Sequence, residues 1–76
     1  MIEEAAMEYT RDELLEARRQ IESTLHKLRE VVKTLEAREN RERCRAQITL
    51  ARRRIKAFEI ANHFIENGLA ADPEIE

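Results

Sequence analysis

Residues 36–43 read Glu36-Ala37-Arg38-Glu39-Asn40-Arg41-Glu42-Arg43, and this nearly all-charged stretch decides the fold. It contains no Gly or Pro, so one long helix running through it is the rival of a chain reversal. The apolar positions on its two sides differ in phase, because Leu35 and Cys44 are nine residues apart, about half a revolution on a straight helix. Asn40 also tolerates the left-handed conformation of tight turns. We therefore predict an all-α, antiparallel two-helix hairpin, with helices over about 10–38 and 42–67 and a turn at about 39–41.

The segment before this stretch carries a heptad seam, in which apolar residues recur every seven positions. Arg18 is the one polar residue in the seam. Val31 and Leu15 lie beside it and widen the apolar stripe. The seam positions are Leu14, Arg18, Ile21, Leu25, Leu28, Val32 and Leu35.

The segment after the stretch has a more regular seam, with steps that alternate between four and three residues. Its positions are Cys44, Ile48, Ala51, Ile55, Phe58, Asn62, Ile65 and Leu69. Asn62 is the one polar residue among them. Gly68 follows Asn67 and suits the left-handed position of a Schellman cap, and Pro73 prevents continuation of the helix. The hairpin domain is therefore expected over 10–69, followed by a disordered acidic tail at 70–76.

The start of the first helix has its own signal. Thr10 and Glu13 have the spacing of a capping box, in which each side chain accepts a hydrogen bond from the other residue's backbone N–H. Asp12 and Glu16 add negative charge at the positive helix end. Residues 1–9 are expected to be a flexible or short helical lead-in.

The composition favours long helices, since 39% of the residues are charged and only 4% are aromatic. The net charge of −2 provides no global field for nucleic acid or membranes. The charge is nevertheless uneven, because residues 41–56 hold seven Arg or Lys and one acid, whereas residues 57–76 hold five acids and no Arg or Lys. No apolar run approaches the roughly 20 residues that span a bilayer, and no signal peptide is visible. The single cysteine fits a cytoplasmic setting.

A second apolar stripe predicts self-association. One seam between two helices covers one face of each, and a chain of 76 residues is marginally stable alone. A contiguous exposed apolar patch usually marks an interface. We expect a homodimer that forms a four-helix bundle, with a helix of another protein as the alternative occupant. The expected interface residues are Leu15, Leu50, Ala57, Ile60, Ala61 and Phe64.

Two groups of polar residues allow a functional interpretation. Arg18 and Asn62 both lie toward the open end of the hairpin, where they could meet and hold an anion; the simpler interpretation is that they fix register and oligomeric state. The basic residues could contact phosphate, but no aromatic is interleaved for stacking and residues 52–54 point in three directions. The alternative is that they pair with Glu22, Glu30 and Glu36. The basic residues are Arg41, Arg43, Arg45, Arg52, Arg53, Arg54 and Lys56.

Metal and thiol chemistry receive little support. His26 and His63 each follow a glutamate by four residues, but zinc sites need three or four ligands. The nearby arginines could lower the pKa of Cys44 and make it reactive, yet a small seam residue is the simpler role. We expect no metal, no cofactor and no small-molecule substrate.

Three functions remain as hypotheses. The first is a small, non-enzymatic protein–protein interaction or oligomerisation module. The second is a nucleic-acid-binding or regulatory hairpin dimer that uses residues 41–56. The third is an enzyme with Arg18 in a bundle pocket.

Overall fold

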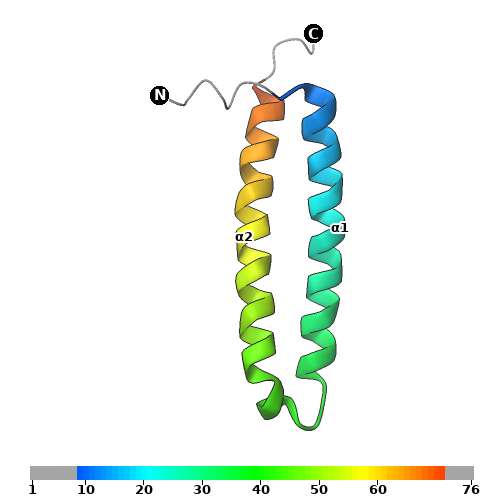
Figure 1. Ribbon diagram of the computed structural model, residues 1–76, viewed down its shortest axis with the longest axis vertical. Coiled ribbons are helices and arrows are strands. Elements are labelled where there is room, and N and C mark those ends of the chain that lie inside the picture. Colours follow the sequence, from blue (N-terminus) through cyan, green and yellow to red (C-terminus); the bar gives the residue numbers. More distant parts are fainter. Residues whose placement is uncertain (1–8, 72–76) are drawn as a thin grey trace.

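The computed structural model describes residues 9–71 and shows a helical hairpin (Figure 1). Helix α1 (Arg11–Glu36) is followed by a short 3₁₀ helix, η2 (Arg41–Cys44), and by α2 (Arg45–Ala70). The two α-helices have 26 residues each, which makes each about 39 Å long. They lie antiparallel and pack against each other along their length. The prediction of an all-α two-helix hairpin is confirmed, and one continuous helix is excluded. Most of the predicted lead-in and tail lies outside the described residues.

The capping box at the start of α1 is confirmed. The Glu13 backbone N–H donates to Thr10 Oγ1 at 3.1 Å, and the Thr10 N–H donates to Glu13 Oε1 at 3.0 Å. These two bonds satisfy donors that have no partner inside the helix. The first turn of α1 is therefore defined by the local sequence.

The turn between the helices differs from the prediction in its backbone. No described residue has a positive φ, and Asn40 lies at φ −99°, ψ 37°. The turn therefore does not use the left-handed conformation that Asn40 tolerates. The chain instead reverses through residues 37–40 and enters η2, where the Arg43 N–H donates to the Asn40 carbonyl at 2.9 Å. Cys44, the last residue of η2, is buried and begins the second seam.

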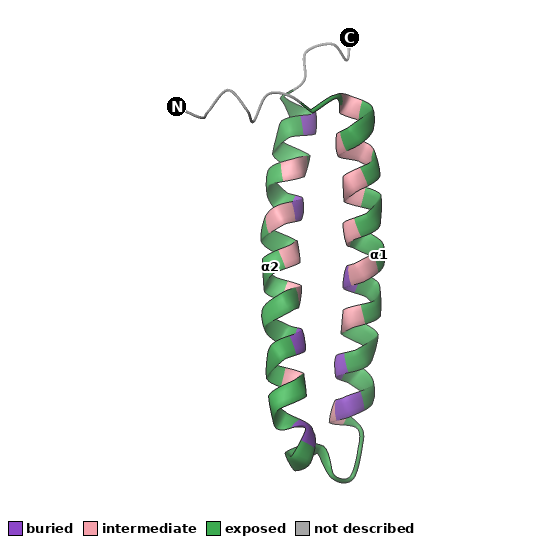
Figure 2. Cartoon of the chain, in the orientation of Figure 1, coloured by how far each residue is buried: buried purple, intermediate pink, exposed green. Residues whose placement is uncertain are grey.

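The two predicted seams form the core of the hairpin. All fifteen of their positions are buried or half-buried, and the outward faces of both helices are exposed (Figure 2). Leu25 is the most deeply buried residue, at 4% exposure. No side chain in the described part of the chain is fully buried, however. Two helices thus define one apolar layer without enclosing it.

The end of α2 corrects the predicted Schellman cap. The helix continues through Gly68 to Ala70, and Gly68 does not have a positive φ. Leu69 is buried, and it takes the next seam position after Ile65 because the helical phase continues past the glycine. The Arg11 guanidinium also donates to the Leu69 carbonyl at 3.5 Å, which caps the last turn from the other helix. Tertiary packing therefore overrides the local stop signal.

A helical Gly68 leads to a stability prediction. Replacing Gly68 with Ala is expected to stabilise the hairpin by about 0.5 kcal/mol, because glycine is a poor helix former. A Cβ at this position would lie 3.6 Å from Leu14 Cδ1, an ordinary van der Waals contact. Urea unfolding followed by circular dichroism measures the change. A destabilised variant would instead indicate a left-handed glycine.

Candidate functional site

The helical phase places one row of α1 beside one row of α2 on each side of the core. We call one side the charged flank and the other the apolar flank. The charged flank consists of Glu22, Arg29, Glu36, Arg45, Arg52, Glu59 and Glu66. The apolar flank consists of Ala17, Thr24 and Val31 on α1, of Leu50, Ala57 and Phe64 in one row of α2, and of Ala61 in the neighbouring row, which also carries Gln47 and Arg54. The two flanks differ in their contacts: side chains on the charged flank form ion pairs between the helices, whereas large side chains on the apolar flank are exposed to solvent.

The charged flank is joined by ion pairs between the helices. Arg29 Nη2 lies 2.9 Å from Glu59 Oε2, and Arg52 pairs with Glu36 nearer the turn. All four side chains are at least 42% exposed, so each pair contributes only about 0–1 kcal/mol to stability. Their main effect is to favour one longitudinal register of α1 against α2. Sequence reasoning anticipated a role for Glu36 but missed the Arg29–Glu59 pair.

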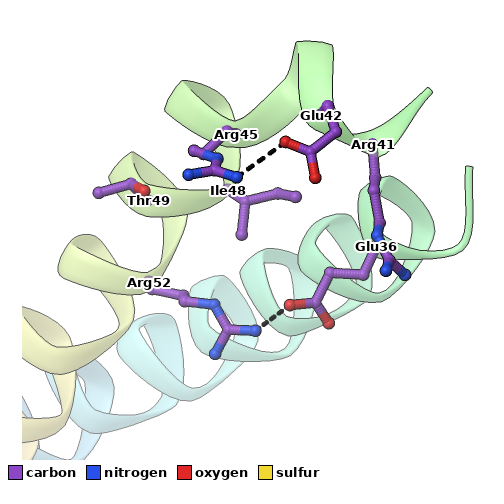
Figure 3. A pocket seen from close by; sticks show the side chains of 7 residues that line it. All are labelled: Glu36, Arg41, Glu42, Arg45, Ile48, Thr49 and Arg52. Carbon is purple, nitrogen blue, oxygen red and sulfur yellow. Dashed lines mark hydrogen bonds and ion pairs between the residues drawn. The ribbon is translucent and has the colours of Figure 1, made fainter.

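An open hollow near the turn is lined by five charged side chains (Figure 3). Arg45 Nη2 lies 2.8 Å from Glu42 Oε1, and Arg41 lines the same hollow. Glu36 and Arg52 line its other side. Each hollow-lining carboxylate pairs with one of these arginines, so the positive charge is largely compensated there.

The apolar flank exposes large hydrophobic side chains. Phe64 is 67% exposed, Leu50 is 47% exposed and Val31 is 46% exposed. Val31 and Leu50 line one open hollow between the helices, together with Arg54. Ile60 is half exposed on the adjoining surface of α2, one turn before Phe64. The flank therefore displays exposed apolar side chains from both helices, with Arg54 beside Val31 and Leu50 in the hollow.

Leu15 does not belong to this surface. It stands seven residues before Glu22 and shares the helical row of the charged flank. It is half-buried at the open end of the hairpin. The six residues predicted for the interface are thus divided, because their common apolar character did not specify which side of the core each one occupies.

The two polar seam residues lie inside the hairpin without bonding to each other. Asn62 is 9% exposed, and its Oδ1 has no hydrogen-bond partner among the described residues. Arg18 is half-buried, and no hydrogen bond joins it to Asn62. A buried amide oxygen without a partner destabilises the fold and favours arrangements that leave it accessible.

Replacing Asn62 with Leu is therefore expected to stabilise the hairpin by about 1 kcal/mol, because the unsatisfied amide is removed from the core. The same change should broaden the distribution of oligomeric masses, since a polar seam residue specifies register and oligomeric state. Thermal unfolding and light scattering measure the two effects. Asn67→Leu, at an exposed position, serves as the control and should shift stability by less than about 0.5 kcal/mol.

The basic residues of 41–56 do not form one stripe. Arg45 and Arg52 lie on the charged flank, whereas Arg54 lines the hollow of the apolar flank. The expected pairing with helix 1 holds for Glu36 only, because Glu30 pairs with Lys33 of its own helix at 3.4 Å. Within residues 9–71, no ion pair is formed by five exposed basic residues of this segment: Arg41, Arg43, Arg53, Arg54 and Lys56.

The remaining candidates stay local. His63 Nε2 lies 3.3 Å from Asn67 Nδ2, and its ring meets Phe64 edge-on at 5.5 Å. No group of three or more His, Cys, Asp or Glu side chains gathers within residues 9–71 to hold a metal ion. Cys44 is a buried free thiol in the seam. The Gln20 hydrogen bond and the nearby Arg19 charge lower the pKa of Glu16, on the exposed face of α1.

Neither α1 nor α2 combines the length and apolar character that crossing a membrane requires. Comparisons with protein-family models, with curated proteins and with solved structures gave no match. The function is therefore inferred from the side chains that the hairpin exposes on its two flanks.

Proposed function

We propose that this protein is a small, non-enzymatic interaction module that assembles through its apolar flank. The main support for this proposal is the contrast between the two flanks. Ion pairs join the helices on the charged flank, whereas Val31, Leu50 and Phe64 are exposed on the apolar flank. Large apolar side chains gathered on one surface gain free energy when a partner removes them from water.

The occupant that this proposal favours is a second copy of the chain. Because no side chain among residues 9–71 is fully buried, the core of a single hairpin is not enclosed, and the apolar flank is one of its open sides. A second hairpin placed on the apolar flank would enclose that side and complete a four-helix, coiled-coil-like bundle. An identical surface on each subunit is also the arrangement of the commonest homodimers. A reducing, cytoplasmic setting is part of the proposal, supported by the buried free thiol of Cys44.

Light scattering coupled to size-exclusion chromatography tests the assembly. At micromolar concentration the expected mass is twice the 9.0 kDa of one chain. The midpoint of thermal unfolding should also rise with protein concentration, because association stabilises the folded state. A folded species with the mass of one chain, and a concentration-independent midpoint, would reject self-association.

A second candidate function is nucleic-acid binding through residues 41–56. The observation in its favour is that Arg43, Arg53 and Lys56 are exposed and form no ion pair within the described residues. Phosphate contacts of this kind give an affinity that falls steeply with salt. An electrophoretic shift assay with mixed RNA and DNA at low salt tests it, and an absence of retardation would remove it.

A further inference from the structure

The two ends of the hairpin carry net charges of opposite sign. Residues 27–56, the half that contains the turn, hold eleven Arg or Lys and four acids, a net charge of +7. The described residues of the other half, 9–26 and 57–71, hold three Arg and six acids, a net charge of −3. The helices are about 39 Å long, several times the Debye length of about 8 Å at physiological salt. A partner lying alongside therefore meets two ends of opposite sign.

The apolar row of α2, which consists of Leu50, Ala57 and Phe64, has side chains whose sizes are arranged symmetrically about its centre. Leu50 stands seven residues before Ala57, and Phe64 stands seven residues after it, so all three share one row. Each end of the row has a large side chain and the centre has a methyl group. When two such rows lie antiparallel with Ala57 at the two-fold axis, Leu50 of each copy faces Phe64 of the other. The small central residues then allow close approach of the two helices.

From the charge and the size pattern together, we propose that two copies associate with opposite orientation, the turn of each beside the open end of the other. The α2 helices then meet through their apolar flanks about Ala57. This inference rests on the proposed self-association and adds the orientation of the partner. It places the basic residues of 41–56 that form no ion pair within residues 9–71 near the acidic end of the second copy, whose field attracts them.

The competing two-fold arrangement places both turns at the same end. It would bring one half of net charge +7 against an identical half, and like charges across an interface weaken association. It would also place α1 of one copy against α2 of the other and separate the two Ala57 residues. Charge and side-chain size therefore favour the same orientation independently.

Spin-label distances distinguish the two orientations. Arg41→Cys places a label at the turn and Arg53→Cys places one near the centre of α2, both at exposed positions and both in a Cys44→Ala background. With opposite orientation, the two Arg41 labels should be about 40 Å or more apart, whereas the Arg53 labels should give a distinctly shorter distance. With both turns at one end, both sites should give similar distances below about 25 Å.

Salt dependence of the unmodified chain gives a second readout that does not rely on the cysteine variants. Attraction between opposite ends predicts that the dissociation constant rises several-fold between 50 mM and 500 mM NaCl. Juxtaposed turns predict that it falls, because salt screens their repulsion. Short Arg41 distances or salt-strengthened association would overturn the orientation and leave self-association intact. A monomeric mass at all concentrations would overturn both.

Discussion

Replacing Phe64 with Glu is expected to reduce the assembly to folded single chains. Phe64 is the most exposed large hydrophobic residue in the described part of the chain and lies at the end of the apolar row of α2. Aromatic anchors at interfaces contribute about 2 kcal/mol or more, so the dissociation constant should increase by at least about 30-fold. A buried carboxylate would add a further desolvation cost. Analytical ultracentrifugation across a concentration series measures the change.

The matched control is Ser23→Glu, which introduces the same charge on the exposed outer face of α1. Its mass and dissociation constant should match those of the parent chain. Helicity at high concentration should be similar in both variants, because Phe64 contributes little to the core of its own hairpin. An unchanged mass for Phe64→Glu would mean that the apolar flank is not the contact surface.

Replacing Leu25 with Ala is expected to have the largest effect on folding. Leu25 is the most buried residue of the hairpin, at the centre of the seam between α1 and α2. Truncation of a buried leucine costs about 2–5 kcal/mol, through lost apolar contacts and the cavity that is left. A small domain has a total stability of only about 5 kcal/mol or somewhat more. We therefore expect most of the cooperative unfolding transition to be lost, as measured by urea titration with circular dichroism.

Leu50→Ala provides the comparison for Leu25→Ala, because it removes the same atoms from a half-exposed position. It should reduce association clearly and should affect the unfolding of dilute, single chains only slightly. Equal losses of stability in the two variants at low concentration would contradict the division between a core seam and an interaction surface.

These variants separate two layers of the molecule that have different origins. The seam holds the two helices together within one chain, and the apolar flank is the surface that we propose for association. Both layers use aliphatic side chains at helical spacing, so their composition alone does not distinguish them. Position relative to the partner helix is what assigns Leu25 to the first layer and Phe64 to the second.

The hairpin itself was predictable because its signals are short-range and periodic. The phase change between Leu35 and Cys44 requires a reversal if both apolar rows are to be buried, and the Thr10–Glu13 capping box sets one helix end. These features depend only on 3.6 residues per turn and on local hydrogen bonds. The sequence by itself therefore determined the class of fold and which residues lie in the core.

The features decided by tertiary structure involve the second helix. Gly68 stays helical because Leu69 must reach the seam and Arg11 caps its carbonyl, although the local signal favours a stop. The pairing of Arg29 with Glu59 depends on the longitudinal register, which is set by the packing of the whole seam and by the 3₁₀ turn. Leu15 and Phe64 are both apolar residues beside a seam, yet the packing of the two helices places them on opposite flanks. Periodicity specifies the angle of a residue around its own helix, but only the second helix specifies what that residue faces.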